Sequence, residues 1–268
     1  MKRSSGARLG ATAAMSVLSL ALITGCSDEG SGDAEGAGKG PQSSASSASP
    51  TGPAAKALGP AELKKLLVAQ GDVKGYKVEA TDESFPRSKS AVKVDKAPCR
   101  PLAYAMAGLA PGDTDASVSS TATEDKKPTS TATSLEDVSE DDFANAFDVT
   151  VTVVGLSSYD GDGAEKAFRS VSDAVASCSG GFTIAAQGED QKLTKVAAEK
   201  GSGTGDESVA FAASGKVDGG ETGDVHTEVV RHGNTIATYY TVSFMKLTSG
   251  GAYTVPAVVV DAQAAKLK

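Results

Sequence analysis

The stretch DVTVTVVGLSSYDGDGAEKAFRSVSDAVASCSGGF, residues 148–182, decides the fold because it joins two different patterns. Its first third is rich in Val and Thr, which is typical of a β-strand. Asp162, with Glu165 three positions later, predicts a capping box at the start of a helix, and Gly180 and Gly181 predict its end. Apolar residues then recur three and four positions apart, as on one face of a helix: Ala164, Ala167, Phe168, Val171, Ala174, Val175 and Cys178.

The chain after this helix favours strands. Five segments have strand composition: GFTIAAQ (181–187), QKLTKVAAE (191–199), ESVAFAAS (207–214), DVHTEVVR (224–231) and NTIATYYTVSFMK (234–246). Gly233 and Asn234 between the last two predict a two-residue hairpin turn. Upstream, we expect a short strand over 75–81 and a strand pair over 116–136 that turns near Lys127.

Three further helices are predicted. One begins at Pro60, ends at Gly71 and carries the leucine face Leu63, Leu66 and Leu67. A short one follows Pro101 in PCRPLAYAMAG (98–108), and a C-terminal one opens at Pro256. Strands that follow one another as hairpins, with few helices between them, indicate an α+β fold: a mostly antiparallel sheet with helices packed on one face.

The N-terminus carries an export signal. Lys2, Arg3 and Arg8 precede an uncharged run from residue 9 to residue 23, of the length of a secretory h-region and too short to span a bilayer. The run ends in Ile-Thr-Gly-Cys26, which resembles the lipobox of bacterial lipoproteins. The resemblance implies that residues 1–25 are a signal peptide and that Cys26 becomes the lipidated first residue, with palmitate-type acyl chains. Two such chains anchor a protein stably. The alternative is a signal that is not cleaved or lipidated.

Two regions follow the signal. Residues 26–57 contain Gly, Ser, Ala, Pro, Thr and scattered charges and lack large apolar residues after the cysteine, so we expect a disordered linker. Its r.m.s. span is about 30 Å. Residues 58–268 are predicted to form a single globular domain. Loss of the three basic signal residues makes the net charge of −8 still more negative, which argues against nucleic acid as a partner.

The two remaining cysteines are Cys99 and Cys178. Outside the membrane, an even pair in one domain most often forms a disulfide. The bridge would join the short helix after Cys99 to the long helix that ends near Cys178. In the chain-entropy model such a bridge contributes roughly 4.5 kcal/mol. The alternatives are two buried thiols, or a redox pair that lacks the usual C-x-x-C spacing.

The chain has two histidines, His226 and His232, both in the predicted hairpin. Asp224, His226 and Glu228 could form a metal site because alternate strand residues share a face. The opposite face is apolar (Val225, Val229, Ile236, Tyr240, Val242 and Phe244) and is expected to face the core. We therefore expect the polar face to be solvated, and we predict no metal and no cofactor.

Other catalytic or ligand-binding patterns are weak. No G-x-S-x-G elbow occurs, and GSGTGDES (201–208) has no P-loop lysine, so neither serine hydrolysis nor phosphate binding is indicated. YDGDG (159–163) begins like a calcium loop but has Val171 at the position of the bidentate Glu. The acidic stretch LEDVSEDD (135–142) is interpreted as a solvated loop, with weak Ca²⁺ binding as the alternative. We predict no catalytic residue and no enzyme.

Four segments together resemble a known family: GDVKGYKV (71–78), PCRPLAYAM (98–106), AFRSVSDAVASCSGGF (167–182) and TEVVRHGNTIATYYTV (227–242). They are similar to actinobacterial secreted lipoproteins with a domain like the extracellular sensor domain of PknH-like receptor kinases. That family often has two disulfides, whereas this chain can form one in its domain. The resemblance implies a sheet with helices on one face, a cleft, and ligand sensing without catalysis; it supplies no binding residues.

The resulting hypothesis is a lipoprotein anchored on the extracellular face of the cell membrane that acts as a non-enzymatic binding or sensor module. Its partners would be the membrane, through the lipid on Cys26, and an unidentified small molecule, lipid or surface protein. One alternative is a carrier that holds a lipid or another hydrophobic ligand in an apolar cavity. Another is an enzyme with unfamiliar chemistry.

Overall fold

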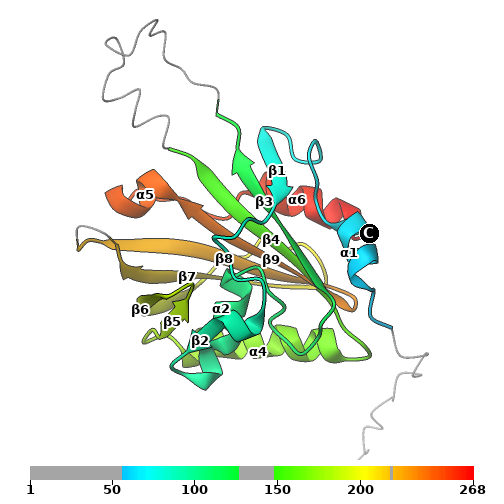
Figure 1. Ribbon diagram of the computed structural model, residues 1–268, viewed down its shortest axis with the longest axis horizontal. Helices are drawn as coiled ribbons and strands as arrows, with labels where there is room; N and C mark the ends of the chain where they lie inside the picture. The colour runs from blue at the N-terminus through cyan, green and yellow to red at the C-terminus, as the bar shows by residue number, and fades with distance from the viewer. Residues whose placement is uncertain (1–55, 127–147, 218–219) are drawn as a thin grey trace, which may run out of the picture. The chain divides into compact units, whose positions relative to one another are not determined.

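Nine antiparallel strands form one sheet in the order β1-β3-β4-β9-β8-β7-β6-β5-β2 (Figure 1). The structure, a computed structural model, describes residues 56–126, 148–217 and 220–268, which belong to one compact unit. The strands are β1 (Tyr76–Ala80), β2 (Val92–Val94), β3 (Ser117–Glu124), β4 (Thr150–Ser158), β5 (Thr183–Ala186), β6 (Glu189–Glu199), β7 (Glu207–Lys216), β8 (Thr222–His232) and β9 (Thr235–Ser243).

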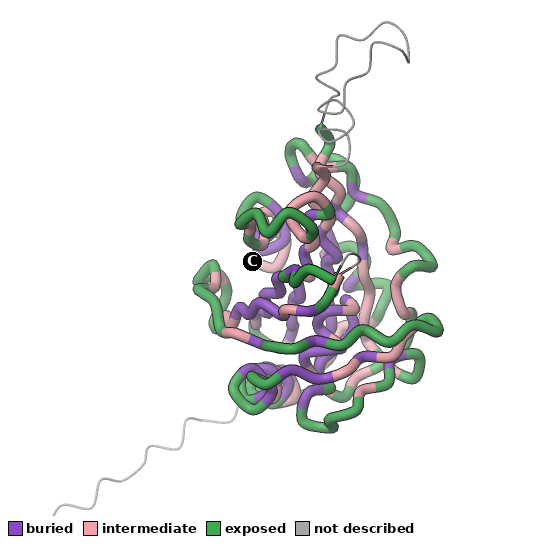
Figure 2. The backbone as a smooth tube through the Cα atoms, turned by 90° about the vertical axis from the view of Figure 1, so that its left-hand side faces the viewer, coloured by how far each residue is buried: buried purple, intermediate pink, exposed green. Residues whose placement is uncertain are grey.

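Helices pack on both sides of this sheet. They are α1 (Pro60–Leu66), α2 (Arg100–Met106), α4 (Gly163–Ser177), α5 (Phe244–Ser249) and α6 (Ala257–Lys266), with 3₁₀ turns η1 (Lys89–Ala91) and η2 (Ala97–Cys99). None of the helices in the described part of the chain is long and apolar enough to cross a membrane. Buried residues concentrate along the central strands and on the helix sides that face them (Figure 2).

The two faces of the sheet each carry a hydrophobic core. Successive residues of a strand point to opposite faces, so Val229 and Val230 of β8 lie in different cores. Val229 packs in the core that includes α2 and α4, which we call the disulfide face. Val230 packs in the core that includes α1 and α6, which we call the α6 face. The predicted α+β class is confirmed, but the helices cover both faces rather than one, because both sides of the central strands are apolar.

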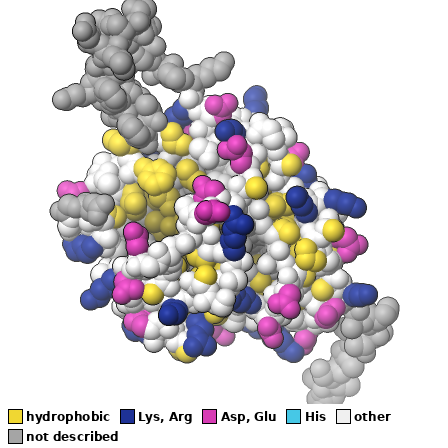
Figure 3. Space-filling model, viewed as in Figure 1, with side chains coloured by type: hydrophobic (Ala, Val, Ile, Leu, Met, Phe, Trp, Pro, Cys, Tyr) yellow, Lys and Arg dark blue, Asp and Glu magenta, His cyan; other side chains and the backbone are white. Residues whose placement is uncertain are grey.

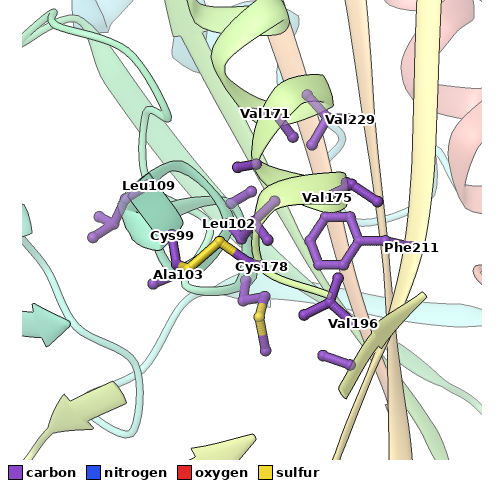
Figure 4. Packing of buried hydrophobic residues seen from close by; sticks show 14 of the residues in the cluster. Cys99, Leu102, Ala103, Leu109, Val171, Val175, Cys178, Val196, Phe211 and Val229 are labelled. Carbon is purple, nitrogen blue, oxygen red and sulfur yellow. A yellow bond between two sulfur atoms is a disulfide. The ribbon is translucent and has the colours of Figure 1, made fainter. Parts of the chain in front are cut away.

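The Cys99–Cys178 disulfide joins the two helices of the disulfide face, as predicted (Figure 4). Cys99 ends η2 directly before α2, and Cys178 is the C-cap of α4. Their Cα atoms are 5.9 Å apart, across a sequence separation of 79 residues. All seven residues predicted for the apolar stripe of α4 are buried, and Val171 and Val175 point toward Val229 and Phe211 of the sheet (Figure 4).

The start of α4 differs from the predicted capping box. Asp162 is the N-cap residue, but its side chain makes no capping hydrogen bond. Its backbone lies at φ −92° and ψ 11° rather than in the extended conformation usual at this position. The carboxylate instead pairs with Lys166 one turn along the helix, at 2.8 Å.

The first helix ends earlier than predicted. Pro60 begins α1, as expected, but the helix ends at Leu66 and not at Gly71. Gln263 of α6 explains the difference, because its amide nitrogen donates to the Leu66 carbonyl at 2.8 Å and its oxygen accepts from the Val68 backbone at 2.9 Å. A side chain distant in sequence therefore takes up backbone groups that another helical turn would have used.

The predicted hairpin at Gly233 and Asn234 is confirmed, since β8 and β9 pair up to His232 and Thr235. Of the strand pair predicted over 116–136, the first strand is β3, and it pairs with β1 and β4. The turn predicted near Lys127 lies outside the described residues.

Candidate functional site

The disulfide face is covered only in part, and an apolar groove remains where α2 and α4 do not reach. Its floor comes from the sheet, where Val151 pairs with Val242 and Val153 with Tyr240 across β4 and β9. The larger part of the groove has a volume of about 260 Å³. Its lining is Phe85, Val151, Val153, Gln191, Val225, Tyr240, Val242, Phe244 and Leu247.

A smaller cavity of about 150 Å³ adjoins this groove and shares Phe85, Gln191 and Tyr240 with it. Its remaining lining comes from α2, β2 and β5, including Met106, Val92 and Ile184. We use the name apolar groove for both parts together. Figure 3 shows hydrophobic side chains gathered in a hollow on this side of the molecule.

Two polar side chains lie where the two parts meet. The Tyr240 hydroxyl and the Gln191 amide make no hydrogen bond to any other residue within 56–126, 148–217 or 220–268. Burial, with a smaller effect from Tyr253, raises the pKa of Tyr240, so its hydroxyl stays protonated at neutral pH and can donate a hydrogen bond. The lining contains no Asp, Glu, Lys or Arg. These properties suit an uncharged, largely apolar ligand with one hydrogen-bonding group.

Phe244 borders the groove and departs from the prediction. It was expected on the core side of the last strand, but its side chain is 56% exposed. The reason is that β9 ends at Ser243 and Phe244 begins α5, so the strand alternation stops one residue earlier. Phe244 therefore extends the apolar lining of the groove to the protein surface.

Two polar residues of the predicted hairpin, His226 and Glu228, are not solvated, contrary to prediction. Glu228 lies directly opposite Tyr239 on β9. His226 and Glu228, however, are 6% and 4% exposed. The His226 imidazole contacts the Glu199 carboxylate at 2.9 Å through Nδ1 and packs edge-on against Tyr253. The segment around Tyr253 and α6 cover this face, which local sequence does not show.

The metal site considered for Asp224, His226 and Glu228 is not assembled. Asp224 is exposed, and His226 pairs with Glu199 of β6 instead. No group of three His, Cys, Asp or Glu side chains in the described residues is placed to hold a metal ion. The structure therefore supplies no geometry for metal chemistry in this part of the chain.

The serine-rich loop has no nucleophile geometry. Ser202 donates both its backbone N–H and its hydroxyl to Glu228 Oε1, each at 2.6 Å. The base of a Ser-His-Asp triad is a histidine, and no serine in the described ranges hydrogen-bonds to a histidine. Glu228 therefore anchors the loop.

Several residues singled out in the sequence lie elsewhere or outside the described ranges. Asp160 accepts a hydrogen bond from the Ala57 backbone at 2.8 Å, and Asp162 pairs with Lys166, so both acids of YDGDG have structural partners. Cys26, the signal peptide, most of the linker and the acidic stretch 135–142 lie outside the described residues. The groove residues Phe85 and Gln191 carry no signal in the sequence, because they come from a loop and from an exposed strand position.

Comparison with known proteins shows a distant structural likeness. No protein-family description matches the chain, and no curated protein matches it. Among solved structures, the chain is similar to the extracellular domain of PknH from Mycobacterium tuberculosis. The two are 13% identical with a TM-score of 0.46, over 79% of this chain and 95% of that one.

Proposed function

We propose that this protein is a non-enzymatic binding or sensor module that holds a small, uncharged, mostly apolar ligand in the apolar groove. The observation that carries the proposal is the groove itself, an open hollow in an otherwise packed face. Ligand sites are mostly apolar concavities with a few polar groups that set orientation, and Tyr240 and Gln191 supply those groups here.

The proposed location is the extracellular face of the cell membrane. Its support is the sequence alone: the charged start, the uncharged run and the lipobox that ends in Cys26. The test is metabolic labelling with palmitate. Cys26→Ser should abolish the label and move the protein out of the membrane fraction. Retention of both label and membrane location in this variant would refute the anchor.

The size of the groove separates a binding module from a carrier of whole lipids. Pockets for drug-sized ligands measure about 300–1,000 Å³, and the two parts of the groove, about 260 and 150 Å³, together reach only the lower part of that range. A small molecule or a single segment of an acyl chain fits this space, and a complete two-chain lipid does not. Native mass spectrometry of protein extracted from cells should therefore show no bound diacyl lipid; its presence would favour the carrier.

The binding experiment uses the neutral apolar fluorophore N-phenyl-1-naphthylamine, whose emission rises in apolar sites. Phe244→Ser should weaken binding of the fluorophore at least about fivefold. The phenylalanine ring borders the groove, and its removal reduces the apolar area that the bound fluorophore can bury. Val258→Ser is the matched control, since Val258 is the other large, exposed hydrophobic residue (41%) among the described residues and lies on α6. Equal effects of the two variants would show non-specific adsorption and would refute the groove as the site.

A further inference from the structure

A second cavity lies on the α6 face, and its chemistry differs from that of the apolar groove. It has a volume of about 380 Å³ and lies between β6, β7 and β8 on one side and the start of α6 on the other. Carboxylates form one part of its lining and aliphatic side chains the other: Glu199, Glu228, Ala210, Val255, Ala257 and Val260. We call it the acidic cavity.

Glu228 is the central residue of the acidic cavity. It is 4% exposed and forms no ion pair with any cation in the described ranges. Its Oε1 accepts two hydrogen bonds from Ser202, at 2.6 Å each. Its Oε2 accepts none from the described residues. A buried carboxylate without a counter-cation is unfavourable, so the second oxygen is a vacant acceptor on the cavity wall.

The surrounding charges do not neutralise Glu228. Glu199 is the other carboxylate of the lining, and its Oε2 pairs with Nδ1 of His226 at 2.9 Å. Lys200 also borders the cavity but forms no ion pair with either glutamate. The first turn of α6 contributes the partial positive charge of a helix N-terminus at Ala257, which is weaker than a full countercharge. Glu228 therefore has no neutralising cation among the residues that line the cavity.

We infer that the acidic cavity binds a primary alkylammonium group, with the ammonium on Glu228 and the alkyl stem against Val255, Ala257 and Val260. An ammonium donates well to a single free oxygen, whereas a guanidinium prefers both oxygens of a carboxylate, and Oε1 of Glu228 is already saturated. A divalent cation needs more ligands than the described residues bring together. The ammonium can come from a small free amine or from the lysine side chain of a partner protein.

The test uses the full chain in a non-ionic detergent and measures dissociation constants from the NMR shifts of the Ser202 and Glu228 amides. The probes are n-butylammonium chloride, n-butanol as its uncharged analogue, and N-acetyl-lysine methylamide. Glu228→Gln keeps the size of the side chain and should weaken ammonium binding roughly 10- to 100-fold, as expected for loss of a hydrogen bond to a charged group. Glu79→Gln is the matched control, on an exposed strand position elsewhere.

A second variant keeps the test informative if Glu228→Gln does not fold. Ala257→Leu fills the cavity from an exposed helix position and should also weaken ammonium binding without removing a charge. Binding of butylammonium indicates that a free amine suffices, and binding of the lysine derivative alone indicates a partner's side chain. Either result supports the inference if Glu228→Gln weakens that binding by the expected factor of roughly 10 to 100. Equal binding of n-butanol, equal loss in Glu79→Gln, or no binding of either ammonium would overturn it, and none of these results bears on the apolar groove.

Discussion

The two faces of the sheet are built by the same strands, yet they hold opposite chemistry. Tyr239 and Tyr240 are neighbours on β9 and point to different faces. Tyr240 borders an apolar groove whose lining has no acidic or basic side chain. Tyr239 is buried on the α6 face opposite Glu228, and its hydroxyl has no hydrogen-bond partner in the described residues. Burial raises the pKa of both phenols, and on the α6 face Glu228 adds to the effect.

The difference follows from what covers each face. On the disulfide face, two helices joined by a covalent bond pack over one part of the sheet and leave the rest open. On the α6 face, α6 and the segment around Tyr253 lie over β8, where His226 and Glu228 are buried. The elements that cover each face thus decide whether its apolar strand residues stay exposed and whether its polar ones are buried. Four substitutions test the contacts that hold these covering elements in place.

The largest expected effect is loss of the disulfide. Cys99→Ala with Cys178→Ala should lower the free energy of unfolding by about 2–5 kcal/mol, because the unfolded chain regains the freedom of a 79-residue separation. Urea unfolding measures the change. The variant should also lose the smaller part of the groove, whose wall includes α2. A change below about 0.5 kcal/mol, within the range of an ordinary surface substitution, would contradict the idea that the bridge holds this face together.

Gly155→Ala should destabilise the disulfide face next. Gly155 lies on β4, where a Cβ would overlap the Gly108 carbonyl oxygen and come within 2.6 Å of Thr238 Oγ1. We expect a loss of about 1–3 kcal/mol from this overpacking, measured by urea unfolding. Gly180→Ala is the control, because nothing lies within 4 Å of its Cβ, and it should be neutral or slightly stabilising. Similar losses in both variants would show that close packing at β4 is not the cause.

Gln263→Ala tests the α6 face. The substitution removes two hydrogen bonds to the end of α1, at 2.8 and 2.9 Å, and leaves the Val68 N–H without its partner. We expect a loss of about 1–2 kcal/mol in thermal or urea unfolding. Gln191→Ala, an exposed glutamine of the groove on the opposite face, should change stability by less than about 0.5 kcal/mol. The reverse order would mean that the α6 face does not depend on this contact.

The smallest effect concerns pH. Asp72 binds Lys266 of α6 at 2.6 Å and accepts a hydrogen bond from the Ala69 backbone, and these contacts lower its pKa below 3.8. Because the unfolded state takes up the proton at higher pH than the folded state, this stabilisation is present above pH 3.8 and is lost as the pH falls below it. Asp72→Asn should remove about 0.2–1 kcal/mol, the range of exposed ion pairs.

The difference in free energy of unfolding between the wild type and Asp72→Asn, recorded from pH 6 to pH 3, should therefore be constant above pH 3.8 and decrease below it. Lys266→Met provides the control, because the double variant should lose little more than either single one. Parallel curves across this pH range would show that the ion pair does not stabilise the contact between α6 and the chain after α1.

The sequence predicted local structure well where one strong pattern controlled it. The apolar stripe of α4, the Gly233–Asn234 turn and the Cys99–Cys178 bridge all appear in the structure. Predictions were wrong where another side chain competed with the predicted contact. Gln263 shortened α1, and Lys166 took the Asp162 carboxylate away from the helix cap. Gln263 lies almost two hundred residues from α1, so local spacing cannot identify it. Lys166 lies four positions from Asp162, but spacing alone does not decide between a cap and an ion pair.

The candidate sites were likewise predicted only in part. The sequence placed Val225, Tyr240 and Val242 on an apolar strand face and His226 and Glu228 on a polar one, and both assignments hold. It could not show that the apolar face stays partly open or that the polar face is buried. Phe85 and Gln191 join the groove from a loop and from an exposed strand position, which the sequence pattern does not relate to the apolar strand face.

The amino-acid sequence by itself determined the elements, the sides of the strands and the cysteine pair, because these follow from spacing along a single stretch of chain. Only the tertiary structure decided which strand face is covered, where a helix stops and which carboxylate is left without a counter-cation. Those outcomes depend on contacts between residues far apart in sequence, and such contacts decide burial, which sets the chemistry of each face.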